Sequence, residues 1–361
     1  MYNFIKMLEV MTDKDVNATD LHIKAGSRPA YRINKQLVFF GNEPISYENI
    51  LQILKENFNP QYLKELETVG SFDYSISIGN VRFRINVFKT QGSIGISARK
   101  ILTPPESFEA LNLPADLIIR IIEKQRGLVI ISGTAGSGKT TTAAAIIQYI
   151  NSHYPKRIVT IEDPIEYVFT DKKSFITQRE VGIDTVSFER GLRDALRQDP
   201  DIIFLGELRD SQSAWIAANA AETGHMVITT VHADSTVKTI YRIIDMFKQE
   251  QREIVKEALI NSLNAIICQK LVNSIKTGNL MPVVEIMVST PTIKGLIRDN
   301  QMSQIYEYIL NGEYDGMITF GKSLRNLIEE GHITKNMAIT LTDHPEELHH
   351  VEENRDRGFI W

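Results

Sequence analysis

Eight residues near the middle of the chain constrain its fold more than any other feature. The segment Gly133-Thr134-Ala135-Gly136-Ser137-Gly138-Lys139-Thr140 fits the pattern G-x-x-x-x-G-K-[ST]. The apolar run Leu128–Ser132 precedes it, and the alanine-rich stretch Thr141–Ile150 follows. A glycine-rich loop between a strand and a helix is the usual phosphate-binding loop of α/β domains, whereas the alternative is a glycine-rich turn without a ligand. Because every fixed position is present in this context, the sequence predicts a phosphate site.

The residue types of this loop suit a polyphosphate. Glycines let backbone N–H groups approach phosphate oxygens, and the N-terminus of the following helix adds the positive end of its dipole. Lys139 is expected to reach the β- and γ-phosphates, and the Thr140 hydroxyl is expected to bind Mg²⁺. We therefore predict that Gly133 to Thr141 bind ATP, with Mg²⁺ as the second cofactor.

The sequence around the loop predicts an α/β domain with a parallel sheet. Short apolar or β-branched runs alternate here with longer helical stretches; the runs are Leu128–Ser132, Arg157–Ile161, Ile202–Gly206 and Met226–Thr230. Continuous apolar strands separated by helices are typical of a parallel sheet covered on both faces. We expect this domain to span residues 114–340 and the chain after about residue 250 to be mostly helical.

The first hundred residues indicate a separate α+β domain, since one domain usually takes about 100–200 residues of a chain of this length. Apolar and polar residues alternate over 72–78 and 83–87, on either side of Gly79-Asn80, which predicts a β-hairpin. A third strand is expected at 94–98 and a helix at 47–58. The domain is expected to cover residues 1–101.

Two further segments complete the predicted domain organisation. Pro104 and Pro105 mark residues 102–113 as a linker. Residues 341–361 are rich in acidic side chains and are interpreted as a solvated or disordered tail. The motif HPEELHH in this tail could bind a metal, but the surrounding composition favours a tail without one.

Acidic residues follow two of the predicted strands, where a parallel sheet places its ligands. Glu207 follows the strand Ile202–Gly206, and the acidic segment 162–166, which ends at Glu166, follows Arg157–Ile161. Such carboxylates can orient an attacking water or bind Mg²⁺ through water, whereas the alternative is that they are exposed loop charges.

Two histidines flank another predicted strand, Met226–Thr230. His225 opens this strand, and His232 follows it by two residues. Both are expected to complete the nucleotide crevice, where they would sense phosphate or hold Glu207. The alternative is a structural role for either ring.

Composition excludes several kinds of protein. The chain has one cysteine, so an intrachain disulfide and a four-cysteine zinc site are excluded, and a reducing cytoplasmic location is expected. Its apolar runs are shorter than the roughly 18 residues that span a bilayer, so no direct membrane span is expected. A net charge of −5 without basic runs gives no reason to expect nucleic-acid binding.

Several ordered motifs resemble those of the secretion ATPases, and within them the PilT-like retraction ATPases of type IV pili. They are IEDPIE at 161–166, QREVG at 178–182, LRDALRQDPD at 192–201, GELRD at 206–210, AETGH to TVH at 221–232, and DLH at 20–22 with RI at 32–33. The resemblance covers about residues 5–335. The stretch 292–299 resembles the family's AIRNLIRE helix but departs from it at Gly295, which costs about 1 kcal/mol in a helix relative to alanine.

The resemblance implies a PAS-like α+β N-terminal domain, a RecA-like P-loop ATPase domain with C-terminal helices, and a homohexameric ring. It implies that Glu166 is the catalytic carboxylate and that Glu207 supports Mg²⁺ and water. Arg84 and Arg99 are candidates to approach the phosphates, although exposed strand charges are an equal alternative. The implied function is type IV pilus retraction, powered in the cytoplasm at the inner face of the membrane through an inner-membrane pilus platform protein.

Three alternative functions remain open at this point. An accessory or assembly ATPase of a related pilus or type II secretion system is the nearest, although assembly enzymes usually carry two C-x-x-C pairs that this chain lacks. A nucleic-acid motor is disfavoured by the charge. A scaffold that does not hydrolyse nucleotide is disfavoured because Lys139, Glu166 and Glu207 are all present.

Overall fold

The computed structural model describes residues 2–13, 15–34, 36–79 and 81–349, and it divides into two compact units. The first unit holds the described residues up to Thr103 together with Glu166–Val168, and the second holds Pro104–Ile165 and the rest of the chain. The division between Thr103 and Pro104 falls inside the range 102–113 that the sequence predicts as a linker. Phe108 and Leu113 of this range are buried in the core of the second unit.

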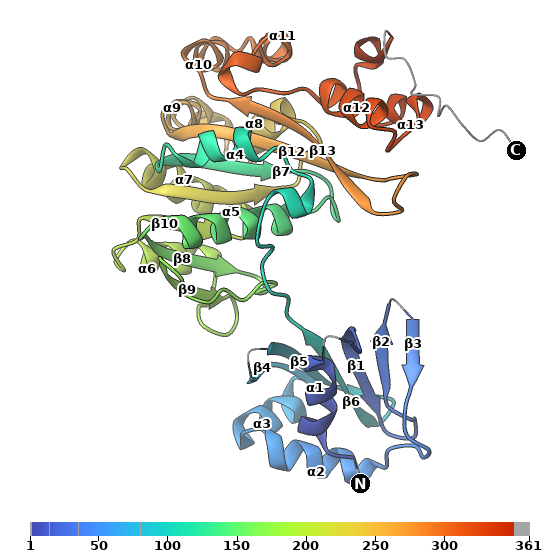
Figure 1. Ribbon diagram of the computed structural model, residues 1–361. Helices are drawn as coiled ribbons and strands as arrows, with labels where there is room; N and C mark the ends of the chain where they lie inside the picture. The colour runs from blue at the N-terminus through green and yellow to red at the C-terminus, as the bar shows by residue number, and fades with distance from the viewer. Residues whose placement is uncertain (1, 14, 35, 80, 350–361) are drawn as a thin grey trace, which may run out of the picture. The chain divides into compact units, whose positions relative to one another are not determined.

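The first unit is a six-stranded antiparallel sheet with the strand order β3-β2-β1-β6-β5-β4 (Figure 1). Its strands are β1 (Ala18–Lys24), β2 (Ala30–Ile33), β3 (Gln36–Phe39), β4 (Ser71–Ile78), β5 (Val81–Thr90) and β6 (Ser93–Lys100), and its helices are α1 (Phe4–Thr12), α2 (Tyr47–Asn57) and α3 (Pro60–Thr68). The predicted hairpin, third strand and helix are β4, β5, β6 and α2, and these predictions are confirmed.

Local sequence explains why these elements form. Phe83, Ile85 and Val87 of β5 are fully buried, as alternation predicts for a strand with one face on the core. The side chain of Ser46 caps α2 by accepting a hydrogen bond from the Asn49 backbone N–H, and Asn59 caps α3 in the same way. The strands β1 to β3 were not predicted: β2 and β3 have four residues each, too few to establish a period, and the short alternation over residues 20–24 of β1 was not recognised.

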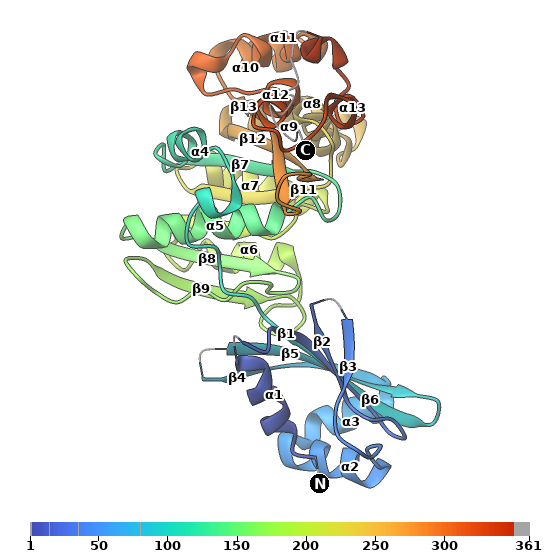
Figure 2. The same ribbon diagram turned by 45° about the vertical axis from the view of Figure 1, so that its right-hand side comes forward.

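The second unit is built on a seven-stranded sheet with the order β13-β12-β7-β11-β10-β8-β9 (Figures 1 and 2). The strands are β7 (Gly127–Ser132), β8 (Arg157–Glu162), β9 (Phe175–Glu180), β10 (Ile202–Leu205), β11 (Met226–Val231), β12 (Leu263–Asn273) and β13 (Leu280–Val288). All neighbours are parallel except the antiparallel pair β12 and β13. The four strands that the sequence predicts are β7, β8, β10 and β11, and they are confirmed.

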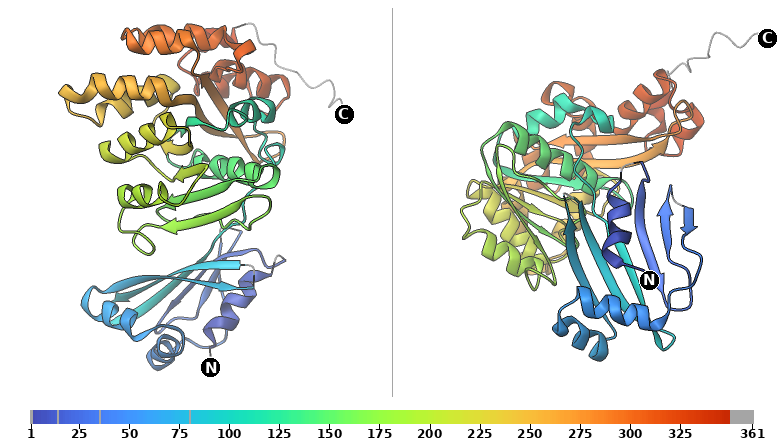
Figure 3. Two further views of the ribbon diagram at one scale, coloured as in Figure 1. Left: turned by 90° about the vertical axis from the view of Figure 1, so that its left-hand side faces the viewer. Right: turned by 60° about the horizontal axis from the view of Figure 1, so that its bottom comes forward.

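Helices cover both faces of this sheet. They are α4 (Ala115–Ile122), α5 (Lys139–His153), α6 (Phe188–Ala195), α7 (Ser211–Glu222), α8 (Thr236–Asp245), α9 (Arg252–Ser262), α10 (Pro291–Arg298), α11 (Ile305–Leu310), α12 (Phe320–Glu329) and α13 (Lys335–Ile339). Helix α5 packs on one face and α7 on the other (Figure 3). Helix α5 connects β7 to β8 and α7 connects β10 to β11, which are steps in opposite directions along the sheet, and right-handed crossovers then place the two helices on opposite faces. In the described ranges, no helix is long and apolar enough to cross a membrane.

The expectation of a mostly helical chain after residue 250 is wrong for residues 263–288. These residues form the hairpin of β12 and β13, which extends the sheet beyond β7. Both strands are largely buried and lack a sustained apolar–polar alternation, and such a mostly apolar stretch is compatible with a buried helix or a buried strand. The helices α10 to α13 follow as expected.

The expectation of a disordered tail from residue 341 is wrong for residues 341–349, and residues 350–361 lie outside the described residues. Pro345–Leu348 form a short 3₁₀ helix in which Leu348 is fully buried. The Glu347 carboxylate accepts hydrogen bonds from the hydroxyls of Tyr306 and Thr319, the second at 2.6 Å. Leu348 and the paired carboxylate of Glu347 thus hold residues 341–349 against the second unit, although the composition of this segment is typical of a solvated tail. Over the described residues, no group of three or more His, Cys, Asp or Glu side chains could hold a metal ion.

Candidate active site

The predicted phosphate loop connects the buried strand β7 to the first residue of α5. Gly133 has φ +150° and Gly138 has φ +89°, and only glycine adopts these conformations without strain. A Cβ on Gly138 would lie 2.7 Å from Nε2 of Gln269, and a Cβ on Gly133 would collide with Ser137 Oγ and the Gln269 carbonyl. Backbone conformation therefore fixes both glycines, and at Gly133 the Gln269 backbone carbonyl also leaves no space for a Cβ.

The rest of the loop faces solvent at the N-terminus of α5. Thr134, Ala135 and Gly136 are exposed, whereas Ser137 is buried beneath them. Thr140 and Thr141 lie half-buried in the first turn of α5, where unpaired backbone N–H groups and the helix dipole favour an anion. The loop thus has the form that the motif predicts.

The Lys139 side chain lies across the loop. Its Nζ donates hydrogen bonds to the carbonyls of Gly133 at 3.0 Å and Thr134 at 2.9 Å. It also lies 3.4 Å from Nδ1 of His232. The ammonium is therefore held within the loop, next to one of the two predicted histidines.

Glu207 is held from both sides. His232 Nε2 lies 3.4 Å from one carboxylate oxygen, and Arg209 Nε donates to the other at 2.8 Å. The guanidinium of Arg209 also donates to Asp163 at 3.1 Å and lies over the ring of Phe188. The hydrogen bond to Glu207 is the main reason why the pKa of Arg209 is raised.

A continuous polar chain therefore runs from Lys139 through His232, Glu207 and Arg209 to Asp163. The topology explains it, because β7, β11, β10 and β8 are parallel neighbours in that order and each contributes residues beyond its carboxyl end. The sequence suggested that His232 would sense phosphate, hold Glu207 in the crevice or serve a structural purpose. Its contact with Glu207 agrees with the second of these.

The structure places His225 elsewhere, so the expectation that both histidines complete the crevice is wrong for this residue within one chain. His225 precedes β11, whose first residue Met226 pairs with Gly127 at the start of β7. The phosphate loop leaves the opposite end of β7. His225 Nδ1 lies 3.0 Å from the carbonyl oxygen of Ala220 at the end of α7, a local structural contact.

Two glutamates, one at the end of β8 and one in the segment after it, lie in different environments. Glu162 is 4% exposed, and its carboxylate accepts hydrogen bonds from Thr160 Oγ1 at 2.6 Å and Gln178 Nε2 at 3.1 Å. Glu166 is exposed and belongs to the first unit, where its backbone carbonyl accepts a hydrogen bond from the Leu102 N–H at 3.2 Å. Glu162 is thus a buried structural acid, whereas the carboxylate of Glu166 faces solvent.

The two predicted arginines of the first unit lie opposite one another. Arg84 of β5 pairs with Arg99 of β6, so both side chains project from the same face of the sheet. Arg84 lies 3.7 Å from the Asp73 carboxylate, and Arg99 donates to Asp20 at 2.7 Å. Burial opposes ionisation of Asp20, but hydrogen bonds from Arg99 and Thr19 outweigh it and lower the pKa of this acid.

Sequence reasoning missed Arg209, Thr142 and Gln269, and it included Asp163 only as a member of the acidic segment 162–166. Asp163 and Arg209 lie in motifs quoted above, at strand ends beside predicted site residues, and that position was a usable signal. Thr142 Oγ1 donates to Gln269 Oε1 at 2.7 Å across 127 residues of sequence. No local pattern marks that pair, because β12 itself was not predicted.

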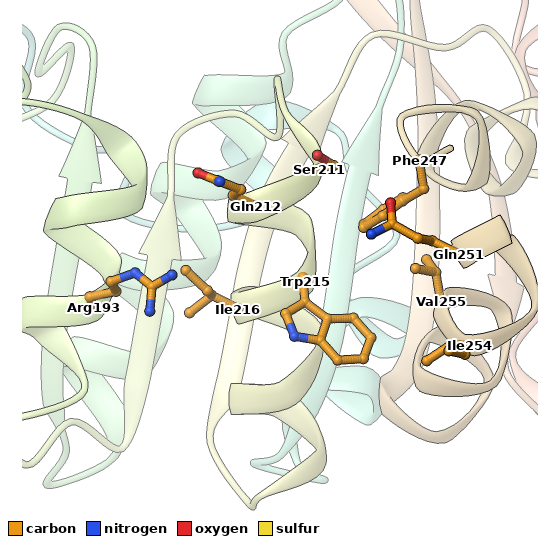
Figure 4. A pocket seen from close by; sticks show the side chains of 9 residues that line it. All are labelled: Arg193, Ser211, Gln212, Trp215, Ile216, Phe247, Gln251, Ile254 and Val255. Atoms are coloured by element: carbon orange, nitrogen blue, oxygen red, sulfur yellow. The ribbon is translucent and has the colours of Figure 1, made fainter. Parts of the chain in front are cut away.

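A mainly apolar hollow of the second unit, formed largely by α7 and α9, is separate from the polar chain that runs from Lys139 to Asp163 (Figure 4). It measures about 300 Å³ and is lined mainly by Trp215 and Ile216 of α7, by Phe247, and by Ile254 and Val255 of α9. Arg193, Ser211, Gln212 and Gln251 complete its lining, so its wall combines apolar side chains with a few polar ones.

Comparison with known proteins identifies relatives over nearly the whole chain. Residues 70–323 match the family described as Type II/IV secretion system protein. The chain is 37% identical over 330 residues to the type IV pilus retraction ATPase PilT of Pseudomonas aeruginosa, across 91% of this chain and 95% of that protein. It is 33% identical over 346 residues to the type IV pilus ATPase PilU of the same species, across 96% of this chain and 90% of that protein.

The fold agrees with these relationships. The crystal structure of the pilus retraction motor PilT with bound ADP matches with a TM-score of 0.87 at 35% identity, across 96% of this chain and 99% of that one. The predicted fold class, an α+β N-terminal domain followed by a P-loop α/β domain, is confirmed by this match. The chain belongs to the Type II/IV secretion system protein family, and it is an ATP-hydrolysing member of the PilT and PilU group.

Proposed function

We propose that this protein is the motor that retracts a type IV pilus, and that it works as a homohexamer. The observation that carries the proposal is the correspondence in length and sequence with the retraction ATPase, which covers 91% of this chain and 95% of the relative. The single cysteine supports it, since the two C-x-x-C pairs that assembly ATPases usually carry are missing.

Within this motor, we propose that Glu166 orients the attacking water and that Glu207 supports Mg²⁺ and water. The Thr140 hydroxyl in the first turn of α5 is the proposed direct ligand of Mg²⁺. The donor set suits this ion, because Mg²⁺ usually binds through one or two protein oxygens together with phosphates and waters. His232 and Arg209 hold Glu207 in place for this task.

We propose that Arg84 and Arg99 act on the nucleotide of a neighbouring subunit. Two guanidinium groups on one face of a sheet can stabilise the charge that develops on a transferring phosphoryl group. A ring provides each site with a neighbour, so the homohexamer is part of the same proposal. The motor would work in the cytoplasm at the inner face of the membrane, bound there by the inner-membrane pilus platform protein.

A deletion strain tests the function directly. Cells without the gene should carry excess pili and lose twitching motility, and the wild-type gene should restore motility. The same strain carrying Lys139→Ala should stay hyperpiliated, because retraction requires hydrolysis. Cells without pili would show an assembly role and overturn the proposal.

The second candidate is an accessory ATPase that works beside a separate retraction motor. The observation that favours it is 33% identity to PilU across 96% of this chain. An accessory enzyme predicts a deletion strain that keeps normal piliation and loses only part of its motility.

A further inference from the structure

Strand β12 forms the wall behind the phosphate loop. It runs parallel to β7, and Cys268 pairs with Ser132, the last residue of β7. The next residue of β12, Gln269, therefore lies beside the start of the loop. Gln269 is 3% exposed although it is polar, so its amide must be satisfied by a specific partner.

Gln269 contacts the loop at both of its ends. A Cβ on Gly133, the first residue of the loop, would collide with the Gln269 backbone carbonyl, and a Cβ on Gly138, the last, would lie 2.7 Å from Gln269 Nε2, so Gln269 fills the space beside both glycines. Its Oε1 accepts a hydrogen bond from Thr142 Oγ1 at 2.7 Å, in the first turn of α5. Thr142 is 1% exposed, so this hydroxyl is buried with its partner.

These contacts place one side chain between the end of β7 and the start of α5. The backbone groups of the loop and the start of α5 bind phosphate only if the end of β7 and the start of α5 are held at a fixed separation. Gln269 lies beside Gly133 at the end of β7 and contacts Gly138 and Thr142 at the start of α5, so it links the two segments. We propose that Gln269 is a positioning residue for nucleotide binding, which acts on the phosphate loop through Gly138 and Thr142.

The competing explanation is that Gln269 and Thr142 are merely a satisfied polar pair in the core. Such a pair affects stability, because removing one partner leaves the other buried without a hydrogen bond. Replacing both by apolar groups of similar shape then restores stability. A positioning role predicts a different result for a variant in which both residues are apolar. Such a variant regains stability, but it still lacks the amide beside Gly138, so nucleotide binding stays impaired.

The test uses the full-length protein and three variants, Gln269→Leu, Thr142→Val and the double variant. Steady-state ATP hydrolysis gives KM and kcat, a fluorescent ADP analogue gives the dissociation constant, and thermal unfolding without nucleotide gives Tm. Thr142→Val is the matched control, since it removes the hydrogen bond but leaves the amide beside Gly138.

We expect Gln269→Leu to raise KM and the ADP dissociation constant about tenfold while kcat changes less than twofold, because the reacting groups stay in place. The double variant should recover the wild-type Tm and keep the raised KM. Thr142→Val should lower Tm and raise KM by less than Gln269→Leu does. A double variant with the wild-type Tm and a KM within twofold of wild type would overturn the proposal, as would a loss of kcat at unchanged KM. If Gln269→Leu alone does not fold, the double variant decides between the two explanations.

Discussion

Arg209 offers a sharp test of the polar chain beside the phosphate loop. Its guanidinium donates to Glu207 at 2.8 Å and to Asp163 at 3.1 Å, so it joins the ends of β10 and β8. In Arg209→Gln, Glu207 loses one of its two flanking partners and keeps His232. We expect the carboxylate to move away from the position in which it can serve hydrolysis.

The structure allows the two effects of this substitution to be estimated separately. The Arg209 side chain is 53% exposed, Asp163 39% and Glu207 19%, so water screens both ion pairs. Pairs of this kind each contribute about 0.2–1 kcal/mol, and losing both should lower the free energy of unfolding by about 1 kcal/mol. Misplacing a group that supports a reacting water or metal costs about 10- to 100-fold in rate. We therefore predict a fall in kcat of that size with KM changed less than threefold.

Urea unfolding and a coupled ATPase assay measure these quantities on one preparation. Arg190→Gln is the matched control, because Arg190 is 61% exposed, pairs with Asp194 on α6 and lies outside the chain from Lys139 to Asp163. That control should lose at most about 0.5 kcal/mol and keep its kcat. If Arg209→Gln loses stability but hydrolyses ATP at the wild-type rate, Arg209 does not position Glu207.

Three further outcomes are expected. Lys139→Ala should abolish ATP hydrolysis while leaving the far-UV circular dichroism unchanged, because we expect the ammonium to bind the β- and γ-phosphates; turnover above a tenth of wild type would contradict this role. Gly295→Ala should raise the free energy of unfolding by about 0.5–1 kcal/mol in urea titration, since Gly295 lies within α10 and an added Cβ meets nothing within 4 Å; an unchanged or lower value would show a hidden packing cost. Cys268 should resist iodoacetamide near pH 9, where an exposed thiol is half ionised, because burial raises the pKa of Cys268 to about 12. Mass spectrometry should find the alkylated cysteine only after denaturant is added, and rapid labelling of the native protein would refute its burial.

Sequence predicted best what is encoded locally. The phosphate loop was recognised because its residue types and their spacing form a short pattern, and the hairpin of β4 and β5 because alternation is a short-range pattern. The hairpin of β12 and β13 was missed because burial on both faces removes alternation. Leu348 docks against the second unit although the composition around it is acidic, and averaged composition does not reveal a single anchoring side chain.

The errors in the site have a topological cause. His225 and His232 are seven residues apart and flank one strand, so they lie at opposite edges of the sheet despite their closeness in sequence. Gln269 and Thr142 are 127 residues apart and touch. Whether these residues lie near one another depends on the order of the strands in the sheet. That order results from long-range packing, which cannot be deduced from a single sequence.

The pairing of β12 with β13 has a mechanical consequence. Nine consecutive positions, from Ala265 with Val288 to Asn273 with Leu280, pair without a break in register. Such a ribbon is about 30 Å long at 3.3 Å per residue and resists stretching, because its backbone is already extended and cross-linked along its length. Strand β12 carries the residue behind the phosphate loop, and β13 leads directly into the helix Pro291–Arg298. Gln269 pairs with Val284 near the middle of this ribbon, so only the stretch of β13 from Val284 to Val288 separates the wall of the loop from the segment that enters α10, and that stretch is extended and paired throughout.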